Sequence, residues 1–382
     1  MKKDNFIYLR GLKALPYSVM CVDGNGQKQY FHPVFRKYVP YSSGQQVKRS
    51  ILESLTGFLG KQLSGITFCF KAETKDGSTK LAEGEVFSTC NPLNVDQLIG
   101  GWMMTKGESK KPKDKKNTEK GMKGKNDEED DSEESFKTLK RRSPLSISAM
   151  TPLHPLLASV VSEDITFDRS DKPHLHNVIV KDDKGHILEE NAVKELLTGN
   201  DRSLYRKWIP GCKRASGLFV YDVAIDLRRL FCVCIEPYEP EVSDKVKREL
   251  ISKNWKEVQT VFGASLLMPK KEREEIIPAI ADALVEWRIT SNQARTFNLM
   301  ESLAIAVSDN NSKLGYAIRA SLSEEDESKA VPIIEAIDGV NMFVTPACGG
   351  YIHTEKEDVN ALEKAKQDLI DRMMAFDYEN QI

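Results

Sequence analysis

The chain has 382 residues, with 55 Lys and Arg against 57 Asp and Glu, and a formal net charge of −2. This length is enough for one large domain with insertions or for two domains. A net charge near zero excludes a protein that coats nucleic acid with its whole surface, so nucleic-acid binding would need local basic patches. No run of eighteen apolar residues occurs, so we expect no transmembrane helix. The N-terminus is too polar for a signal peptide, and we expect a cytoplasmic protein.

The N-terminal part of the chain predicts alternating strands and one helix. Residues 6–15 read as a strand, and Asp23-Gly24-Asn25-Gly26 marks a turn. A helix is predicted over residues 44–59, because Ser43 followed three residues later by Gln46 forms a capping box. Two further strands are predicted near residues 66–70 and 84–89.

Residues 106–142 differ in composition from the rest of the chain. They are nearly all Lys, Asp, Glu, Ser and Gly, basic at residues 110–116, acidic at 127–131 and basic again at 140–142. Such a segment buries too little apolar area to offset its ordering entropy, so we predict a mobile loop. Two interpretations stay open: a solvated insertion, or an electrostatic arm that touches nucleic acid.

Beyond this loop, regular structure is predicted again from residue 216. Residues 216–227 read as a strand, and the apolar pattern continues over 231–235. We predict further elements from periodicity: helices over 243–255, 276–287, 333–337 and 358–374, and a strand over 341–344. Residues 300–307 and 314–320 read either as two strands or as a strand and a helix. The order of these elements predicts an α+β fold with a split β-α-β, or ferredoxin-like, core from which residues 100–204 project.

The start of the first helix carries the most informative chemistry. Lys48 and Arg49 follow the capping box, although helix N-termini are positive and favour acidic residues. Free backbone N–H groups, the hydroxyls of Ser42 and Ser43 and the two cations together form a plausible phosphate cradle. The alternative is that Lys48 and Arg49 simply point into solvent.

Three motifs resemble one known family. Ser42-Ser43-Gly44-Gln45-Gln46-Val47-Lys48-Arg49 is similar to the signature that opens the first helix of CRISPR-associated backbone subunits of the Cas-seven family, DevR-like branch. Residues 216–227 are similar to the family's serine-glycine-aromatic strand, and Ser291-Asn292-Gln293-Ala294-Arg295 to its small-residue loop that ends in arginine. The chain departs from the family at Cys21-Val22-Asp23-Gly24-Asn25, where the family has asparagine-arginine-aspartate, and by the additional Gly44.

The resemblance implies a fold and a function. It implies an α+β fold with a modified ferredoxin-like, RNA-recognition (RAMP) core: a palm of residues 1–99 and 205–382, and a finger and thumb insertion over 100–204 that includes the mobile loop 106–142. Several copies would stack along one crRNA in a Cascade-like type I effector complex, without catalysis, cofactor or metal. Their partners would be the crRNA, target DNA through the guide, other copies and other CRISPR-associated subunits, with no membrane. The implied RNA-binding residues are Ser42, Ser43, Gln46, Lys48, Arg49 and Arg295.

Two other functions stay open. In a type III-like complex the chain would cleave target RNA, with Asp23, Asp168 or Asp171 as the candidate residue. A small-molecule enzyme would use Cys348 as nucleophile with His353 nearby, although no phosphate-binding, metalloprotease or nucleophile-elbow motif occurs.

Several other residues have a structural and a functional interpretation. Cys232 and Cys234 are favoured as small buried residues over metal ligands, and a metal role for His174 and His176 is disfavoured. Trp208, near Lys213, is favoured as part of a turn packed on the core over a base-stacking ring.

Overall fold

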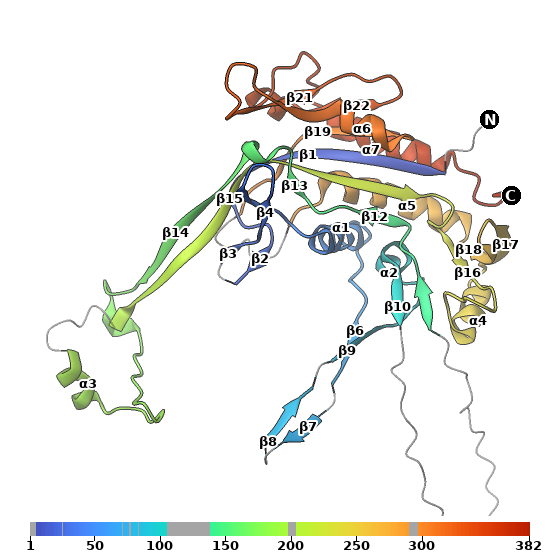
Figure 1. Cartoon of the computed structure of the whole chain (residues 1–382). Helices are drawn as coiled ribbons and strands as arrows, with labels where there is room; N and C mark the ends of the chain where they lie inside the picture. The colour runs from blue at the N-terminus through green and yellow to red at the C-terminus, as the bar shows by residue number, and fades with distance from the viewer. Residues whose placement is uncertain are drawn as a thin grey trace, which may run out of the picture.

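The computed structural model describes residues 5–24, 26–70, 72–75, 78–82, 84–104, 138–197, 204–289 and 297–382. An antiparallel sheet forms its centre, and the main path through this sheet runs β12-β15-β1-β19-β22 (Figure 1). Two more strands, β13 and β14, pair with β15. The strands are β1 (Phe6–Ser18), β12 (Leu145–Ile147), β13 (Thr151–Pro152), β14 (Ala158–Asp168), β15 (Arg206–Asp226), β19 (Glu301–Ser308) and β22 (Asn341–Val344).

The connectivity of this sheet confirms the predicted α+β class. Strand β1 lies between β15 and β19 and is antiparallel to both. With helices α1 (Gly44–Phe58) and α5 (Lys270–Glu286), the order β1-α1-β12-β15-α5-β19 reads β-α-β-β-α-β. Because the first strand of this series lies between the third and the fourth, the connectivity is that of a split β-α-β motif.

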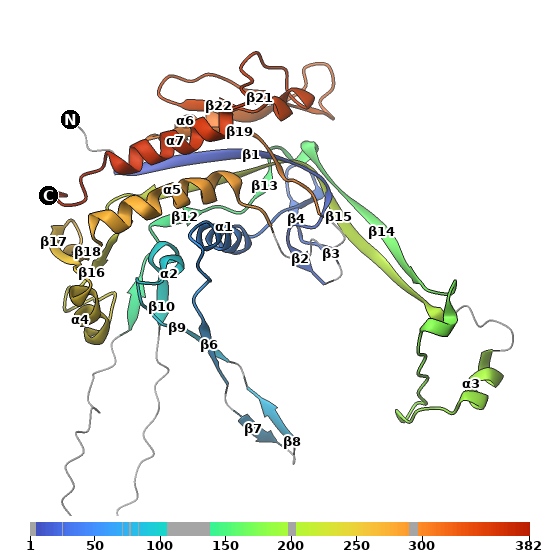
Figure 2. The same ribbon diagram turned by 180° about the vertical axis from the view of Figure 1, so that it is seen from behind.

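Each face of the sheet carries a hydrophobic core. Helix α5 lies between α1 and α7 (Ala361–Met374) and contacts both on one face (Figure 2). Leu9, Ile51, Phe219, Ile280 and Leu369 are buried there. A smaller core on the opposite face includes residues from α6 (Asn311–Ala317) and β20 (Ile318–Leu322). Strand β20 pairs with β21 (Ala330–Ile334).

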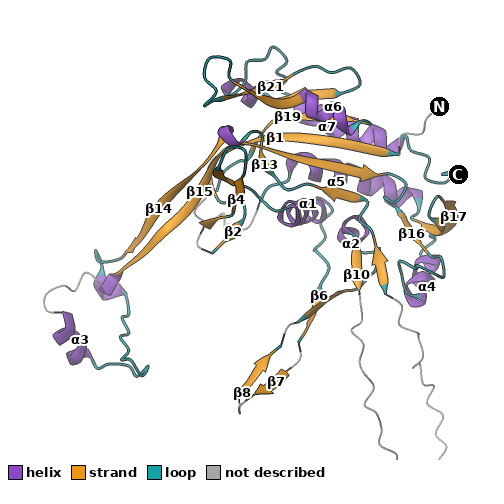
Figure 3. Cartoon of the chain, viewed as in Figure 1, coloured by secondary structure: helices purple, strands orange, loops and turns teal. Residues whose placement is uncertain are grey.

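Two long arms project from this body, as the strands in Figure 3 show. In the first arm, β6 (Ile66–Cys69) pairs with β9 (Glu85–Ser88), and β7 (Ala72–Lys75) pairs with β8 (Ser78–Leu81). In the second arm, β14 pairs with the first part of β15, and α3 (Glu190–Leu197) lies at its far end. None of the helices in the described ranges is both long enough and apolar enough to span a membrane.

The remaining elements are short. They are β2 (Val22–Asp23), β3 (Gly26–Gln27), β4 (Gln29–His32), β5 (Lys37–Pro40), α2 (Val95–Gly100), β10 (Trp102–Met104), β11 (Leu139–Arg141), β16 (Cys232–Cys234), α4 (Asp244–Ser252), β17 (Lys256–Thr260) and β18 (Gly263–Leu267).

Three sequence-based predictions differ from the structure. The mobile loop predicted over 106–142 lies mostly outside the described residues. The prediction is wrong for its last part, because Leu139–Arg141 forms β11. Residues 333–337 are not a helix, because β21 pairs with β20 over Ala330–Ile334. Trp208 is not in a turn on the core: it lies in β15 opposite Thr166 and is 60% exposed. The division at residues 100 and 204 stays a prediction.

A buried lysine lies on the helix-covered face of β1. Lys13 is 2% exposed, and its Nζ donates to Ser302 Oγ at 2.8 Å and to the Met300 carbonyl at 3.3 Å. Its ammonium lies over the rings of Tyr221 and Trp287. Burial lowers the pKa of Lys13 from 10.5 to about 7, with the nearby Arg288 as a second cause.

We expect this lysine to make the stability of the fold depend on pH. Between pH 7 and 10.5 the unfolded chain binds a proton that the folded chain does not, so the free energy of unfolding rises with pH in this window. The contribution approaches about 1.4 kcal/mol per pH unit. The free energy of unfolding of the wild type and of Lys13→Met can be measured with denaturant at several pH values in this range. Its increase per pH unit should be smaller in Lys13→Met by that amount, and an equal increase in both proteins would contradict the assignment.

Candidate nucleic-acid interface

Helix α1 begins as the capping box predicts. Ser43 is the N-cap residue, and its Oγ accepts a hydrogen bond from the Gln46 amide at 3.3 Å. The first turn holds no acidic residue. The N–H groups of Gly44 and Gln45 belong to those that find no acceptor within a helix. The helix therefore presents an uncompensated positive end.

The additional glycine in the signature has a structural reason. A Cβ atom at Gly44 would lie 3.2 Å from the Ile147 carbonyl oxygen and 3.3 Å from the Ala149 nitrogen. These contacts are tighter than ordinary van der Waals contact, so a residue with a side chain would fit here only if the neighbouring backbone shifted. Gly44 thus lets the first turn of α1 pack directly on the chain that leaves β12.

Ser42 joins the start of α1 to the same segment. Its backbone forms a bridge with Met150, with N–H to carbonyl distances of 2.9 and 3.0 Å. The residue is fully buried, and its Oγ has no hydrogen-bond partner among the described residues and no contact with solvent. The Ser42 hydroxyl would therefore reach a phosphate only after this bridge opens, whereas Ser43 is only half-buried. The predicted role of Ser42 stays a prediction.

The two cations of α1 lie in different surroundings. Lys48 is half-buried, and its Nζ donates to the Gly100 carbonyl, at the end of α2, at 2.6 Å. Burial lowers the pKa of Lys48. Arg49 has a side chain that is 65% exposed, and its Nε donates to Glu53 Oε1 at 2.8 Å. The interpretation that both simply point into solvent is therefore wrong for Lys48, although its ammonium retains donors beyond the bond to Gly100.

A cleft with an aromatic ring and a cation lies close to the start of α1. Two adjoining cavities, of about 390 and 380 Å³, share Gln29, Tyr38 and Lys213 in their walls. Tyr38 is 65% exposed. The buried Gln27 ties this region to the residue before Ser42, because its Nε2 donates to the Tyr41 carbonyl at 2.8 Å. Sequence reasoning missed Tyr38, although the adjacent Lys37 and Tyr38 could have indicated a cation beside an aromatic ring.

Not all predicted site residues are gathered at this place. Ser42, Ser43, Gln46, Lys48 and Arg49 lie together because they belong to one helix start. Arg295 lies outside the described residues.

The aspartates considered for RNA cleavage do not share one site. Asp23 lines one of the two cavities that hold Tyr38 and Lys213. Asp168 ends β14, where its carboxylate accepts from the Ser170 amide at 2.9 Å and pairs with Arg206 at 3.0 Å. Asp171 follows Asp168 three residues later in the chain and is exposed. Asp168 thus caps a turn, which is the structural use expected of an isolated aspartate.

Cys348, Cys232 and Cys234 are in surroundings that disfavour reactivity. Cys348 is buried, and burial raises its pKa to about 11, so little thiolate forms near neutral pH. Cys232 is buried in β16 as predicted, its pKa is raised to about 12, and Cys234 is half-buried. Among the described residues, no group of three or more His, Cys, Asp or Glu side chains is placed to hold a metal ion.

Comparison with known proteins found similar structures but no similar sequences. No protein-family profile and no curated protein matches the sequence. Similar solved chains include one from a "CRISPR RNA-guided surveillance complex", with 11% identity, a TM-score of 0.37, and coverage of 96% of this chain and 83% of that one. Another is from a "CRISPR RNA-guided surveillance complex, pre-nicking", with 9% identity, a TM-score of 0.42, and coverage of 96% and 88%. Similarity at these TM-scores identifies neither a family nor a function.

Proposed function

We propose that this chain is a non-catalytic subunit that grips the backbone of a guide RNA in a Cascade-like CRISPR interference complex. Several copies would stack along one crRNA, next to other effector subunits, and would meet target DNA through the guide. The sheet would serve as a modified RNA-recognition core, with the two projecting arms as finger and thumb. The observation that carries the proposal is the start of α1, where a serine-capped N-terminus precedes two cations and lacks an acid in its first turn.

The electrostatics of this helix favour an anion. Two cations near a positive helix end destabilise it by a few tenths of a kcal/mol each, whereas a bound phosphate reverses the sign of that contribution. The free N–H groups of the first turn, the remaining donors of Lys48 and the exposed guanidinium of Arg49 offer charge-assisted hydrogen bonds. None of these groups distinguishes one base from another, so the contacts would be independent of sequence.

The cleft beside the helix supports the same proposal. Tyr38 offers an exposed aromatic face, and Lys213 and Lys37 lie in the walls of the same cavity. A cation beside an aromatic ring is a common arrangement for single-stranded nucleic acid, because stacking on a ring tolerates any base. Together with α1, the cleft would give the chain a backbone contact and a stacking contact.

The proposal is tested by fluorescence anisotropy with short single-stranded RNAs of unrelated sequence. We expect similar affinities for all of them and a decrease of log K with log salt. Three phosphate contacts, at Lys48, Arg49 and Lys213, predict a slope of about −2. Strong preference for one sequence, or no binding at low salt, would contradict sequence-independent backbone binding.

A further inference from the structure

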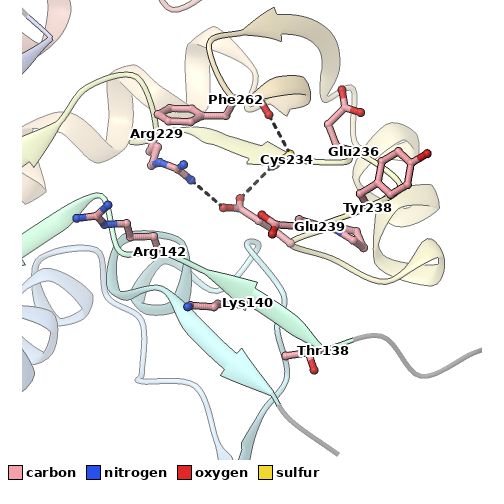
Figure 4. A pocket seen from close by; sticks show the side chains of 11 residues that line it. Thr138, Lys140, Arg142, Arg229, Cys234, Glu236, Tyr238, Glu239 and Phe262 are labelled. Carbon is pink, nitrogen blue, oxygen red and sulfur yellow. Dashed lines mark hydrogen bonds and ion pairs between the residues drawn. The ribbon is translucent and has the colours of Figure 1, made fainter.

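A separate cleft of about 970 Å³ lies between β11 and the segment that follows β16 (Figure 4). Thr138, Lys140 and Arg142 line one wall, and the opposite wall runs from Cys234 to Glu241. No residue of this cleft belongs to the α1 site described above.

Strand β11 is held firmly at the edge of this cleft by Arg141. The Arg141 side chain is fully buried and pairs with Glu241 at 2.8 Å. Its guanidinium also donates to the carbonyls of Leu98, Arg229 and Cys232, and it lies over the ring of Trp102. A strand fixed by so many contacts holds its backbone in one arrangement, so binding a ligand here requires no ordering of the backbone.

The two residues that flank Arg141 are exposed cations. Lys140 in β11 and Arg142, which directly follows β11, alternate with the buried Arg141 and line the cleft (Figure 4). Within the described part of the chain, neither side chain has a hydrogen-bond or ion-pair partner. Residues two apart in a strand are separated by about 6.8 Å, which is similar to the spacing of successive phosphates along an extended nucleic-acid strand.

One of the three acids on the opposite wall is paired with cations. Glu241 pairs with Arg141 and with Arg229, the latter at 3.1 Å. Glu236 accepts from the Ala264 amide at 2.6 Å. Glu239 is the remaining acid of this wall. The wall at β11 therefore carries two cations and no acid, whereas Glu236 and Glu239 keep their negative charge on the opposite wall, so an anionic ligand would bind against the β11 wall.

An aromatic ring completes the cleft. Tyr238 is 94% exposed, and Figure 4 shows it at the end of the cleft opposite β11. Pro237 and Pro240 lie on either side of it and restrict the backbone of this segment. A restricted, exposed ring gives a base a stacking surface at low entropic cost.

Lys140 and Arg142 also lie next to the α1 site. Ser143, which follows Arg142, donates from its Oγ to the Ile99 carbonyl at 3.0 Å. Lys48 donates to the carbonyl of the next residue, Gly100. A strand that leaves Lys48 along this surface would meet Arg142 and then Lys140.

We propose that this cleft binds a single-stranded nucleic-acid segment, with successive phosphates on Lys140 and Arg142 and a base stacked on Tyr238. This inference rests on the proposed function, since it extends the same binding surface. The segment would be either a continuation of the RNA held at α1 or a separate strand. The shared chemistry is an extended phosphodiester backbone with an unpaired base.

The test uses the full chain and photo-cross-linking with 4-thiouridine. In one arm a single 4-thiouridine RNA binds alone, and in the other an unlabelled RNA binds first and a second, 4-thiouridine-labelled strand is added. We expect a cross-linked peptide that contains Tyr238. A cross-link in the first arm identifies a continuation of the RNA held at α1, and a cross-link in the second arm identifies a separate strand. Lys140→Glu combined with Arg142→Glu should abolish the cross-link and weaken binding of that strand at least about tenfold.

The controls separate this inference from the proposed function. Lys270→Glu combined with Lys271→Glu makes the same charge change at the start of α5 and should keep both the cross-link and the affinity. Both replaced side chains of the cleft are exposed, and thermal unfolding checks that this variant is folded. If the wild type binds RNA without a Tyr238 cross-link in either arm, and the cleft variant binds like the wild type, the inference alone is overturned. If the wild type binds no RNA, both proposals fail.

Discussion

Replacing Lys48 and Arg49 together by glutamate is expected to weaken RNA binding at least about 100-fold, because each charged hydrogen bond to a phosphate contributes about 1.5–3 kcal/mol. The two substitutions also place negative charge beside the phosphates that the helix end attracts. Gel-shift titration at low salt measures the effect. The slope of log K against log salt should become shallower by about 1.4, since two phosphate contacts are lost.

The matched control for this variant is the pair Lys270 and Lys271, which also lie side by side near the start of a helix. Their replacement by glutamate changes the net charge by the same amount and should leave RNA affinity within a factor of about three. Lys48 has a structural contact with Gly100, so thermal unfolding must show that its variant is folded. A folded Lys48 and Arg49 variant with wild-type affinity would show that α1 does not contact RNA.

Replacing Arg141 by methionine is expected to lower the free energy of unfolding by about 3 kcal/mol or more, since it breaks a buried ion pair and leaves acceptors without a donor. The carbonyls of Leu98, Arg229 and Cys232 and one Glu241 oxygen would each lose a hydrogen bond. Because these groups come from distant parts of the chain, the loss would loosen β11 from the segment that carries β16. Denaturant unfolding measures the difference.

Arg142→Met serves as the control, since it removes the same type of side chain from the next position. Arg142 is exposed, so we expect a change within about 0.5 kcal/mol. Equal destabilisation by the two variants would contradict the distinct role assigned to Arg141. The comparison is informative because the two residues are adjacent, identical in type and opposite in environment.

These two arginines show why part of the structure was beyond sequence reasoning. Lys140-Arg141-Arg142 closes a strongly charged segment, and local composition predicts solvated side chains for all three. The buried position of Arg141 depends on Glu241, which is 100 residues away in the chain, and on Cys232, which is 91 away. No local pattern encodes these partners. Trp208 is similar, because a Pro-Gly turn signal beside it was overridden by pairing between β14 and β15.

The start of α1, in contrast, could be predicted because its determinants are local. The N-cap, its hydrogen bond to the third helical residue and the apolar face of the helix all lie within residues 43–59. The contact from Lys48 to Gly100 was not predictable, since 52 residues separate the two. The order of strands and helices also predicted the α+β class and a split β-α-β core, whereas the pairing of β13 and β14 with β15 had to come from the structure.

The measurement that tests the central proposal most directly is purification of this chain from cells that express it together with its neighbouring genes and a candidate guide RNA. Bound nucleic acid is then extracted and sequenced, and the mass of the particle is measured. We predict one discrete short RNA in a particle that holds several copies of the chain. A nucleic-acid-free monomer, from cells shown to contain the guide and the neighbouring proteins, would contradict the proposal.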